Sequence, residues 1–342
     1  MIKEAFKKLA AEFAQAELWE DLLDSDVFGL QLNNGRMAYC CVMGNSGIHR
    51  GLGIYMGDRG YRSYLDQVNK EGANSPEALF DRSATFEDLQ ISFEDDGTVE
   101  WWSHHPGLAP SPENATDEEL DIMCQALKAG IFLRRLIDER DGDVISLGFD
   151  EMEEYPTKDG GKEALLLKPI GEDGYACDVC QLPAYDNSDE RLLEQMADNV
   201  VASGRFAINL SMLQGLRKAG TLQCRLIYPP TPIKENDDAI GYYPRWLLAV
   251  VKGNGMVIPV EVVRLDDEQG VYTMLTSFCE SIFKQGHAPL QISVPDYATE
   301  CLLKTLCRRL NVVLVRERYA MKPFNDAWKS LFSYLENDSR KK

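Results

Sequence analysis

The sequence predicts an α+β protein built from two domains. Its 342 residues correspond to about two domains of ordinary length. In the first half, short apolar segments alternate with Asn-Gly and Asp-Gly turns, which indicates antiparallel hairpins. In the last third, segments typical of strands and segments typical of helices take turns along the chain. We therefore expect an acidic α+β domain over residues 1–183, and an α/β domain with its connecting helix over residues 184–342.

The first domain is predicted from two periodicities. Apolar residues that recur near helical spacing predict helices, and alternation around tight turns predicts strands. The expected helices cover 3–23, 61–70 and 117–140, and the expected strands lie in a hairpin over 27–47 and at 52–56, 89–95, 98–105, 163–169 and 174–182. Thr116 is expected to cap the long helix, and Asp58 to cap the helix that precedes the second hairpin.

The second domain shows a defined order of elements. A helix is expected over 188–202, and a long loop over 228–244 separates the first two strands. The expected strands are 221–228, 245–252, 256–265, 290–294 and 311–315. The expected helices that follow are 271–285, 297–310 and 324–337. The order is β-β-β-α-β-α-β-α. An antiparallel three-strand meander followed by alternating helices and strands matches the ribonuclease H-like layout, which we therefore predict for residues 184–342 by analogy.

A nuclease on such a fold needs several carboxylates to hold two metal ions, from the first strand and from the region of the fourth strand. The first strand, TLQCRLIY, contains no acid. Asp296 follows the fourth strand, but its expected role is to cap the helix that begins at Tyr297. The alternative to a non-catalytic protein is a metal-dependent hydrolase or nuclease that combines Asp296 with Asp266 or Asp267.

The charge of the chain is unevenly distributed. The total is −19, with −22 over residues 1–243 and +3 over residues 244–342. A strongly acidic chain repels phosphate backbones, so nucleic acid is not an expected partner. One basic cluster is predicted to be a solvated face or a dock for the acidic first half; it consists of Lys304, Arg308, Arg309, Arg316, Arg318 and Lys322. No apolar segment is long enough to span a membrane, and the start does not read as a secretory signal, so we expect a cytoplasmic protein.

The nine cysteines are predicted to be reduced thiols. Cys177 and Cys180 form a CxxC, but a structural zinc site needs four ligands and the chain has no second pair. Residues three apart in a strand point to opposite faces, which also argues against a redox pair. No calcium-loop, P-loop, GxSxG or HExxH signature occurs, so we expect no metal and no cofactor.

The segment Trp101-Trp102-Ser103-His104-His105 is the main candidate for a ligand or partner surface. Strand alternation places Trp101, Ser103 and His105 on one face, and Trp102 and His104 on the other. One face should belong to the core, and the other could present an aromatic ring and a histidine to a ligand. The alternative is that the tryptophans are core residues and the histidines are solvated or hydrogen-bonded within the fold.

The glycine-rich segment over 51–60 is a second, weaker candidate. Its glycines do not fit GxGxxG, and a strand lies inside the segment instead of before it. A turn-and-cap role is therefore favoured over dinucleotide binding. An anion site at the start of the following helix, with Asp58 and Gly60, is the remaining possibility.

The segment FGLQLNNGRMAYCCVMGNSGIHRGLGIYMGDRGYRSYL, residues 28–65, contains an FGV-type strand, a variant of GYCxVMG and the pattern GLxxYxGxxGxxSY. In these features it resembles the first domain of an uncharacterised bacterial two-domain family. The second half resembles the domain that follows it, through a Pro-rich segment, the strand pair around Gly253–Gly255, VPD before a helix and NDAWKSL. Both domains are of unknown function, so the resemblance implies no catalytic residue. Some relatives carry a terminal SEC-C zinc motif, which the segment LENDSRKK lacks.

These observations favour a non-catalytic protein that binds another protein or a small molecule. No set of acid, base and nucleophile emerges from the motifs, whereas the Trp-His segment and the charge asymmetry are typical of recognition surfaces.

Overall fold

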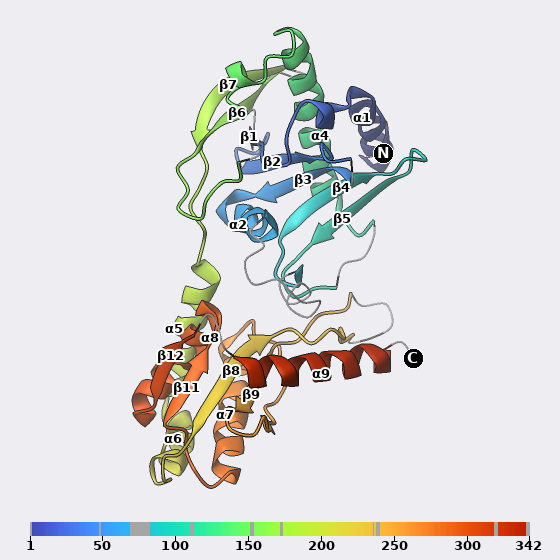
Figure 1. Cartoon of the computed structure of the whole chain (residues 1–342). Coiled ribbons are helices and arrows are strands. Elements are labelled where there is room, and N and C mark those ends of the chain that lie inside the picture. The colour runs from blue at the N-terminus through green and yellow to red at the C-terminus, as the bar shows by residue number, and fades with distance from the viewer. Residues whose placement is uncertain are drawn as a thin grey trace. The chain divides into compact units, whose positions relative to one another are not determined.

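The computed structural model describes residues 2–47, 49–68, 83–109, 113–150, 154–171, 174–234, 236, 240–317 and 321–339. The chain forms two compact units (Figure 1). The first unit contains Met1–Gly72, Thr85–Pro106 and Pro110–Asp186, and the second contains Ala73–Ala84, Gly107–Ala109 and Asn187–Lys342. Each unit has its own sheet and its own core, and the predicted α+β class is confirmed.

The first unit is built on a seven-stranded sheet with the order β5-β4-β3-β2-β1-β6-β7. Its strands are β1 Val27–Gln31, β2 Met37–Met43, β3 Arg50–Met56, β4 Asp88–Phe93, β5 Val99–His104, β6 Glu163–Ile170 and β7 Gly174–Gln181. Only β1 and β6 pair in parallel; the other neighbours are antiparallel, so the predicted hairpins are confirmed.

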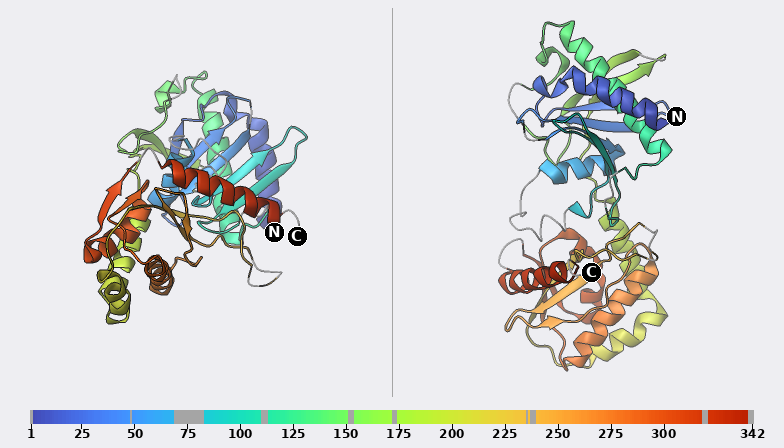
Figure 2. Two further views of the ribbon diagram at one scale, coloured as in Figure 1. Left: turned by 60° about the horizontal axis from the view of Figure 1, so that its bottom comes forward. Right: turned by 90° about the vertical axis from the view of Figure 1, so that its right-hand side faces the viewer.

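Helices cover both faces of this sheet (Figures 1 and 2). The helices α1 (Ile2–Ala16) and α4 (Asp117–Asp138) share one core, to which Cys40 and Val42 of β2 contribute. The helix α2 (Gly57–Val68) lies on the opposite face, where the core contains Tyr39 and Cys41 of the same strand. Both faces of β2 are thus buried, which explains the unbroken apolar sequence AYCCV.

Three helix ends refine the sequence prediction. The expected helix over 3–23 ends at Ala16, because Glu17 adopts a left-handed conformation with φ of 47°. The helix α2 begins at Gly57, so Asp58 lies inside its first turn and the prediction of Asp58 as N-cap is wrong. At α4, Thr116 and Glu119 form a capping box, as expected.

The second unit has a five-stranded sheet with the order β10-β9-β8-β11-β12. The strands are β8 Thr221–Ile227, β9 Trp246–Val251, β10 Val257–Ile258, β11 Gln291–Val294 and β12 Val313–Arg316. The central strand β8 pairs antiparallel with β9 and parallel with β11, and β11 pairs parallel with β12. The sheet is therefore mixed, with its parallel half formed by the last two strands.

Among the described helices of this unit, four share the core on one face of the sheet and one packs on the other face (Figures 1 and 2). The four are α5 Ser188–Ala202, α6 Ala207–Gln214, α7 Glu268–Lys284 and α8 Tyr297–Leu310, and the single helix is α9 Lys322–Ser339. Strict alternation in β9 supports this arrangement: Leu247 and Ala249 join the four-helix side, whereas Leu248 and Val250 pack against Phe324 and Trp328 of α9.

The predicted order of elements in this unit is correct, with two main differences: a shorter third strand and one additional helix. The third strand has two residues instead of 256–265, since Pro259 follows and has no N–H to donate. The helix α6 is additional to the prediction. Residues 69–82 and 110–112 and part of the predicted loop over 228–244 lie outside the described residues.

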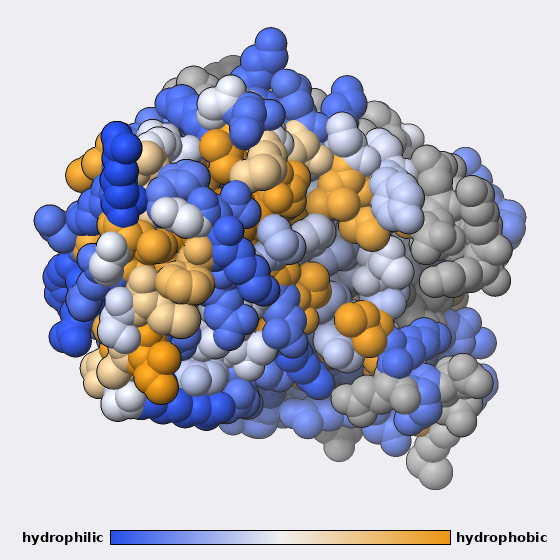
Figure 3. Space-filling view, turned by 90° about the horizontal axis from the view of Figure 1, so that it is seen from below, coloured by the Kyte–Doolittle hydropathy of each residue, from blue (hydrophilic) through white to orange (hydrophobic). Residues whose placement is uncertain are grey.

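The surfaces of the described residues are mixed. In Figure 3, apolar side chains gather in several separate groups that are bordered by hydrophilic ones, as on most protein surfaces. Among the helices that the structure describes, none has the length and apolar character needed to cross a membrane.

Candidate functional site

The register of the β4–β5 hairpin brings the candidate histidine next to a carboxylate. Asp88 lies opposite His104, and Gln90 lies opposite Trp102. Directly opposed residues of an antiparallel pair point to the same face. Gln90 also lies opposite Gly53 of β3, and the ring of Tyr55 lies over Gly53 on the same face of the sheet. All these side chains therefore lie on the face that carries α2.

Asp88 is the centre of a buried hydrogen-bond network. Its side chain is fully buried, and its Oδ1 lies 2.6 Å from Nδ1 of His104. Its Oδ2 accepts from Nε2 of Gln67 at 2.6 Å and from Nε2 of Gln90 at 2.8 Å. The carboxylate thus has three partners, which offsets the cost of burying it.

The network extends to Tyr55. The pKa of Tyr55 is raised well above its usual value, mainly by burial and to a smaller extent by the nearby Asp88. The hydroxyl of Tyr55 is therefore protonated. That hydroxyl donates to Oε1 of Gln67 at 3.1 Å. With its oxygen committed to Tyr55, the Gln67 amide is oriented so that its N–H points to Asp88.

This network fixes the ring of His104. An ionised carboxylate only accepts hydrogen bonds, so the proton shared with Asp88 belongs to Nδ1. In the neutral ring, Nε2 then carries the free electron pair. The side chain of His104 is 21% exposed, and Trp102, two residues away on the same face, is partly exposed. The pair Trp102 and His104 therefore presents an aromatic ring and an oriented imidazole.

The other two predicted residues lie elsewhere. Trp101 is 1% exposed and packs against Phe6 in the core of α1 and α4, with the ammonium group of Lys3 5.0 Å from its ring. It belongs to the core and not to the surface. His105 lies on the same side of the strand as Trp101, as alternation predicts, and is exposed.

His105 belongs to a cluster with Ser103 and Glu119 that has the residue types of a catalytic triad without its geometry. Ser103 Oγ donates to Glu119 Oε1 at 2.6 Å, and both groups contact the same nitrogen, Nε2 of His105, at 3.0 and 3.1 Å. A triad requires the acid on the other ring nitrogen. Burial opposes ionisation of Glu119, but hydrogen bonds from Ser103 and Thr116 and the nearby His105 lower its pKa. Through these contacts with Glu119, the cluster connects β5 to the first turn of α4.

The residues that carry the sequence resemblance build the corner that supports the network. Gly60 is buried, and a Cβ there would lie 2.8 Å from the backbone of Tyr55. Ser63 Oγ accepts from the backbone N–H of Glu87 at 2.8 Å, immediately before β4. Tyr64 lies between sheet and helix, stacked on Tyr61. These contacts hold α2 close to the sheet, which allows Gln67 to reach Asp88.

The weaker anion candidate gains no support from its geometry. Gly60 is covered by the backbone of Tyr55, and Asp58 adds a negative charge in the first turn of α2. Both features oppose an anion at this helix start, and the anion site stays a prediction.

The structure adds three residues to the candidate site that the sequence analysis did not single out: Gln67, Asp88 and Gln90. One signal could have found Asp88. The tight turn at Asp95–Gly97 sets the hairpin register, and that register places Asp88 opposite His104. Gln67 has no comparable signal, because its contact depends on how α2 packs.

The cysteines are all free, and one of them differs from the rest. Cys177 is exposed on β7, Cys180 is partly buried on the same strand, and the other seven are buried. Burial raises the pKa of Cys279 and Cys307 to about 12 and that of Cys124 and Cys301 to about 11.

We expect Cys177 alone to react rapidly with a thiol-specific disulfide reagent in the folded protein at about pH 8. Fewer thiolates form at a raised pKa, so the buried cysteines are slow for two reasons, access and protonation. Counting the released chromophore in the native protein, in a Cys177→Ser variant and in denaturant gives the measurement. Rapid reaction that survives Cys177→Ser would contradict the prediction.

The acids of the alternative metal site serve other purposes. Asp296 caps α8 by accepting from Thr299 N at 2.8 Å, as expected, and its other oxygen lies 3.5 Å from Nε of Arg225 on β8. Asp267 caps α7, and Asp266 pairs with Arg264 at 2.9 Å. Within the described residues, no group of three or more His, Cys, Asp or Glu side chains could hold a metal ion.

The basic cluster predicted near the end is partly paired inside the second unit. Lys304 pairs with Glu194 at 2.7 Å, and Arg316 pairs with Glu300 at 3.3 Å. Arg318 lies outside the described residues. These pairs support the interpretation of a solvated face.

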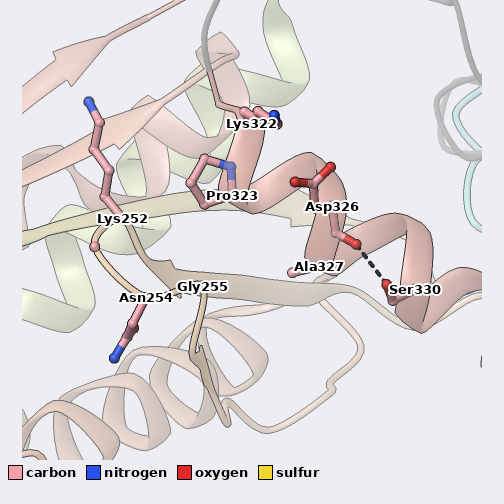
Figure 4. A pocket seen from close by; sticks show the side chains of 9 residues that line it. Lys252, Asn254, Gly255, Lys322, Pro323, Asp326, Ala327 and Ser330 are labelled. Atoms are coloured by element: carbon pink, nitrogen blue, oxygen red, sulfur yellow. Dashed lines mark hydrogen bonds between the residues drawn. The ribbon is translucent and has the colours of Figure 1, made fainter.

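The second unit also has an open depression between the β9–β10 turn and α9 (Figure 4). It encloses about 510 Å³ and is lined by Lys252, Lys322, Asp326 and Ser330 among others. Ser330 donates to the backbone oxygen of Asp326 at 2.9 Å, and Asn254 points away from the helix. The lining combines apolar surface with charged side chains of both signs, unlike the largely apolar lining of most small-molecule sites.

In comparisons with known protein families, two parts of the chain match domains to which no activity has been assigned. Residues 4–101 match the model of a domain of unknown function, DUF7309, and residues 210–332 match that of a second one, DUF6930. No curated protein and no solved structure matches the chain. The chain therefore contains two tandem domains of unknown function, as the resemblance implied. The first match includes Tyr55, Gln67 and Asp88 and ends just before Trp102.

Proposed function

We propose that the protein is a non-catalytic binding protein, and that its first unit contacts a protein or small-molecule partner through Trp102 and His104. The observation that carries the proposal is the buried Asp88, which orients the His104 ring while the imidazole edge and Trp102 stay partly exposed. Side chains held by a supporting hydrogen-bond network are typical of sites that recognise a partner. Ser103 lies 3.0 Å from Nε2 of His105 but donates its hydroxyl hydrogen to Glu119, and Glu119 contacts the same ring nitrogen, so these three residues lack the order of a catalytic triad.

We also propose that the second unit is a ribonuclease H-like scaffold used for binding and not for metal chemistry, with the boundary between the domains near residues 183–187. Support comes from the strand order, in which a central strand has an antiparallel meander on one side and two parallel strands on the other. The central strand carries Arg225, whose guanidinium faces Asp296. A cation in this position opposes the binding of divalent metals. The nine free thiols favour a reducing, cytoplasmic location.

The site is tested with a ligand screen on matched variants. A metabolite library and an array of short peptides are applied to the full chain, to a Trp102→Ala/His104→Ala variant, and to a control, His49→Ala/Val179→Ala, with both changes at exposed residues of the same unit. We expect at least one binder whose Kd rises about tenfold or more in the site variant and stays within about twofold in the control. The proposal is overturned if no ligand discriminates between the two variants.

A further inference from the structure

We infer that the partner of this site is a polypeptide segment with exposed Lys or Arg side chains, which lies across the α2 face of the β4–β5 hairpin. This inference rests on the proposed function and names the partner's chemistry. Three features of the hairpin carry it: its charge, the row of side chains on β5, and the covered edge of that strand.

The charge of the first domain favours a cationic partner. Residues 1–183 hold 16 basic and 36 acidic residues, a net charge of −20, whereas the rest of the chain is close to neutral. The hairpin is an extreme case, since residues 87–104 contain six acids and no Lys or Arg. Arg59 pairs with Glu87 at 2.9 Å, and Arg50 approaches Asp95 at 3.4 Å, but Asp95 stays 98% exposed. A basic segment would be attracted to this hairpin and an acidic one repelled.

The face of β5 presents three groups that each favour a cation or a hydrogen-bond donor. Glu100, Trp102 and His104 follow one another at every second residue and so share a face, about 7 Å apart. The exposed Glu100 can pair with an ammonium or guanidinium group. The ring of Trp102 can receive a cation, as Trp101 already does from Lys3.

His104 completes the row as an acceptor. Nδ1–H of His104 donates to Asp88, so the ring in its neutral form offers the electron pair of Nε2 to an N–H group of the partner. A carboxylate partner would find an acceptor there and a negative charge at Glu100. The row therefore selects against acidic peptides as well as for basic ones.

The partner lies across the face of the hairpin and does not add a strand to its edge. Two backbone groups of β5 on its outer edge are already used: Trp101 O accepts from Glu113 N at 2.9 Å, and Ser103 N donates to Asn114 Oδ1 at 3.0 Å. Because this edge is covered, main-chain pairing with a peptide strand is blocked there. Recognition then depends on side chains, and a row about 13 Å long fits an extended segment better than a single amine.

The experiment uses the full chain and peptides of about nine residues that alternate Lys and Ala, with versions that replace Lys by Arg, by acetyl-lysine or by Glu. Binding is measured by calorimetry at about 50 and about 300 mM salt. We expect the Lys and Arg peptides to bind, with weaker binding at high salt, and the acetylated and Glu peptides to bind at least about tenfold more weakly.

Variants separate the site from the overall charge. Glu100→Gln and Glu12→Gln each remove one exposed negative charge, the first in the row and the second on α1. We expect Glu100→Gln to weaken the Lys peptide about three- to tenfold and Glu12→Gln by less than about twofold, and Trp102→Ala to weaken it about tenfold. Equal effects of the two Gln variants would show attraction by net charge only and would overturn the inference.

Three further outcomes overturn the inference in distinguishable ways. If free lysine amide binds as tightly as the peptide, the site takes a small amine and not a polypeptide. If the screen finds neutral or acidic ligands that depend on Trp102 and His104 while the basic peptides do not bind, the inference fails and the proposed function stands. If no ligand depends on these residues, both fail.

Discussion

Replacing Asp88 by alanine is expected to lower the free energy of unfolding of the first unit by about 3 kcal/mol. The carboxylate is fully buried and accepts from His104, Gln67 and Gln90. Alanine would leave these three donors without their acceptor and would open space at the corner between α2 and the sheet. A loss of this size shifts the melting temperature of a unit of this length by about 6–12 °C.

Calorimetry of the full chain, with hydrogen exchange to assign the transition to the first unit, measures this loss. The control is Asp95→Ala in the same hairpin, whose carboxylate is exposed and which should leave the transition unchanged. A second readout is the Nδ1 proton of His104 in NMR spectra, which should exchange slowly in the wild type and rapidly in Asp88→Ala. If both Asp variants melt alike and the proton is not protected in the wild type, the network does not hold His104.

The two neighbouring tryptophans are expected to respond very differently to truncation. Trp101→Ala removes a side chain that is 1% exposed and in edge-to-face contact with Phe6, and should cost about 3–5 kcal/mol. Trp102→Ala removes a partly exposed ring from the other face and should cost clearly less, about 1–2 kcal/mol.

Urea unfolding followed by far-UV circular dichroism compares the two variants without relying on tryptophan fluorescence. Hydrogen exchange in β3 and β4 confirms that the loss occurs in the first unit. In binding assays the larger effect should come from Trp102→Ala, because this variant should remain folded but bind the partner poorly. A Trp102 variant less stable than the Trp101 variant would show that the faces of β5 are assigned the wrong way round.

Much of the fold follows from local signals. The capping box at Thr116, the turn at Asp95–Gly97 and the alternation in β5 are properties of neighbouring residues, and each is confirmed. The predictions of element ends failed where the backbone conformation or the packing of a neighbouring element determined where a helix or strand begins or ends. Pro259 ended β10 early, and the left-handed Glu17 ended α1 at Ala16. The Asp58 cap was wrong because the helix starts at Gly57, directly after β3.

The sequence alone determined the two-domain α+β class, the order of elements in the second domain, and the two faces of the Trp-His segment, since these depend on periodicities of two and about four residues. Only the tertiary structure decided which face is core and which residues support His104. Gln67 meets Asp88 because α2 packs closely over Gly60 against β3. Contacts between elements of this kind depend on the packing of the whole unit, which no short stretch of sequence encodes.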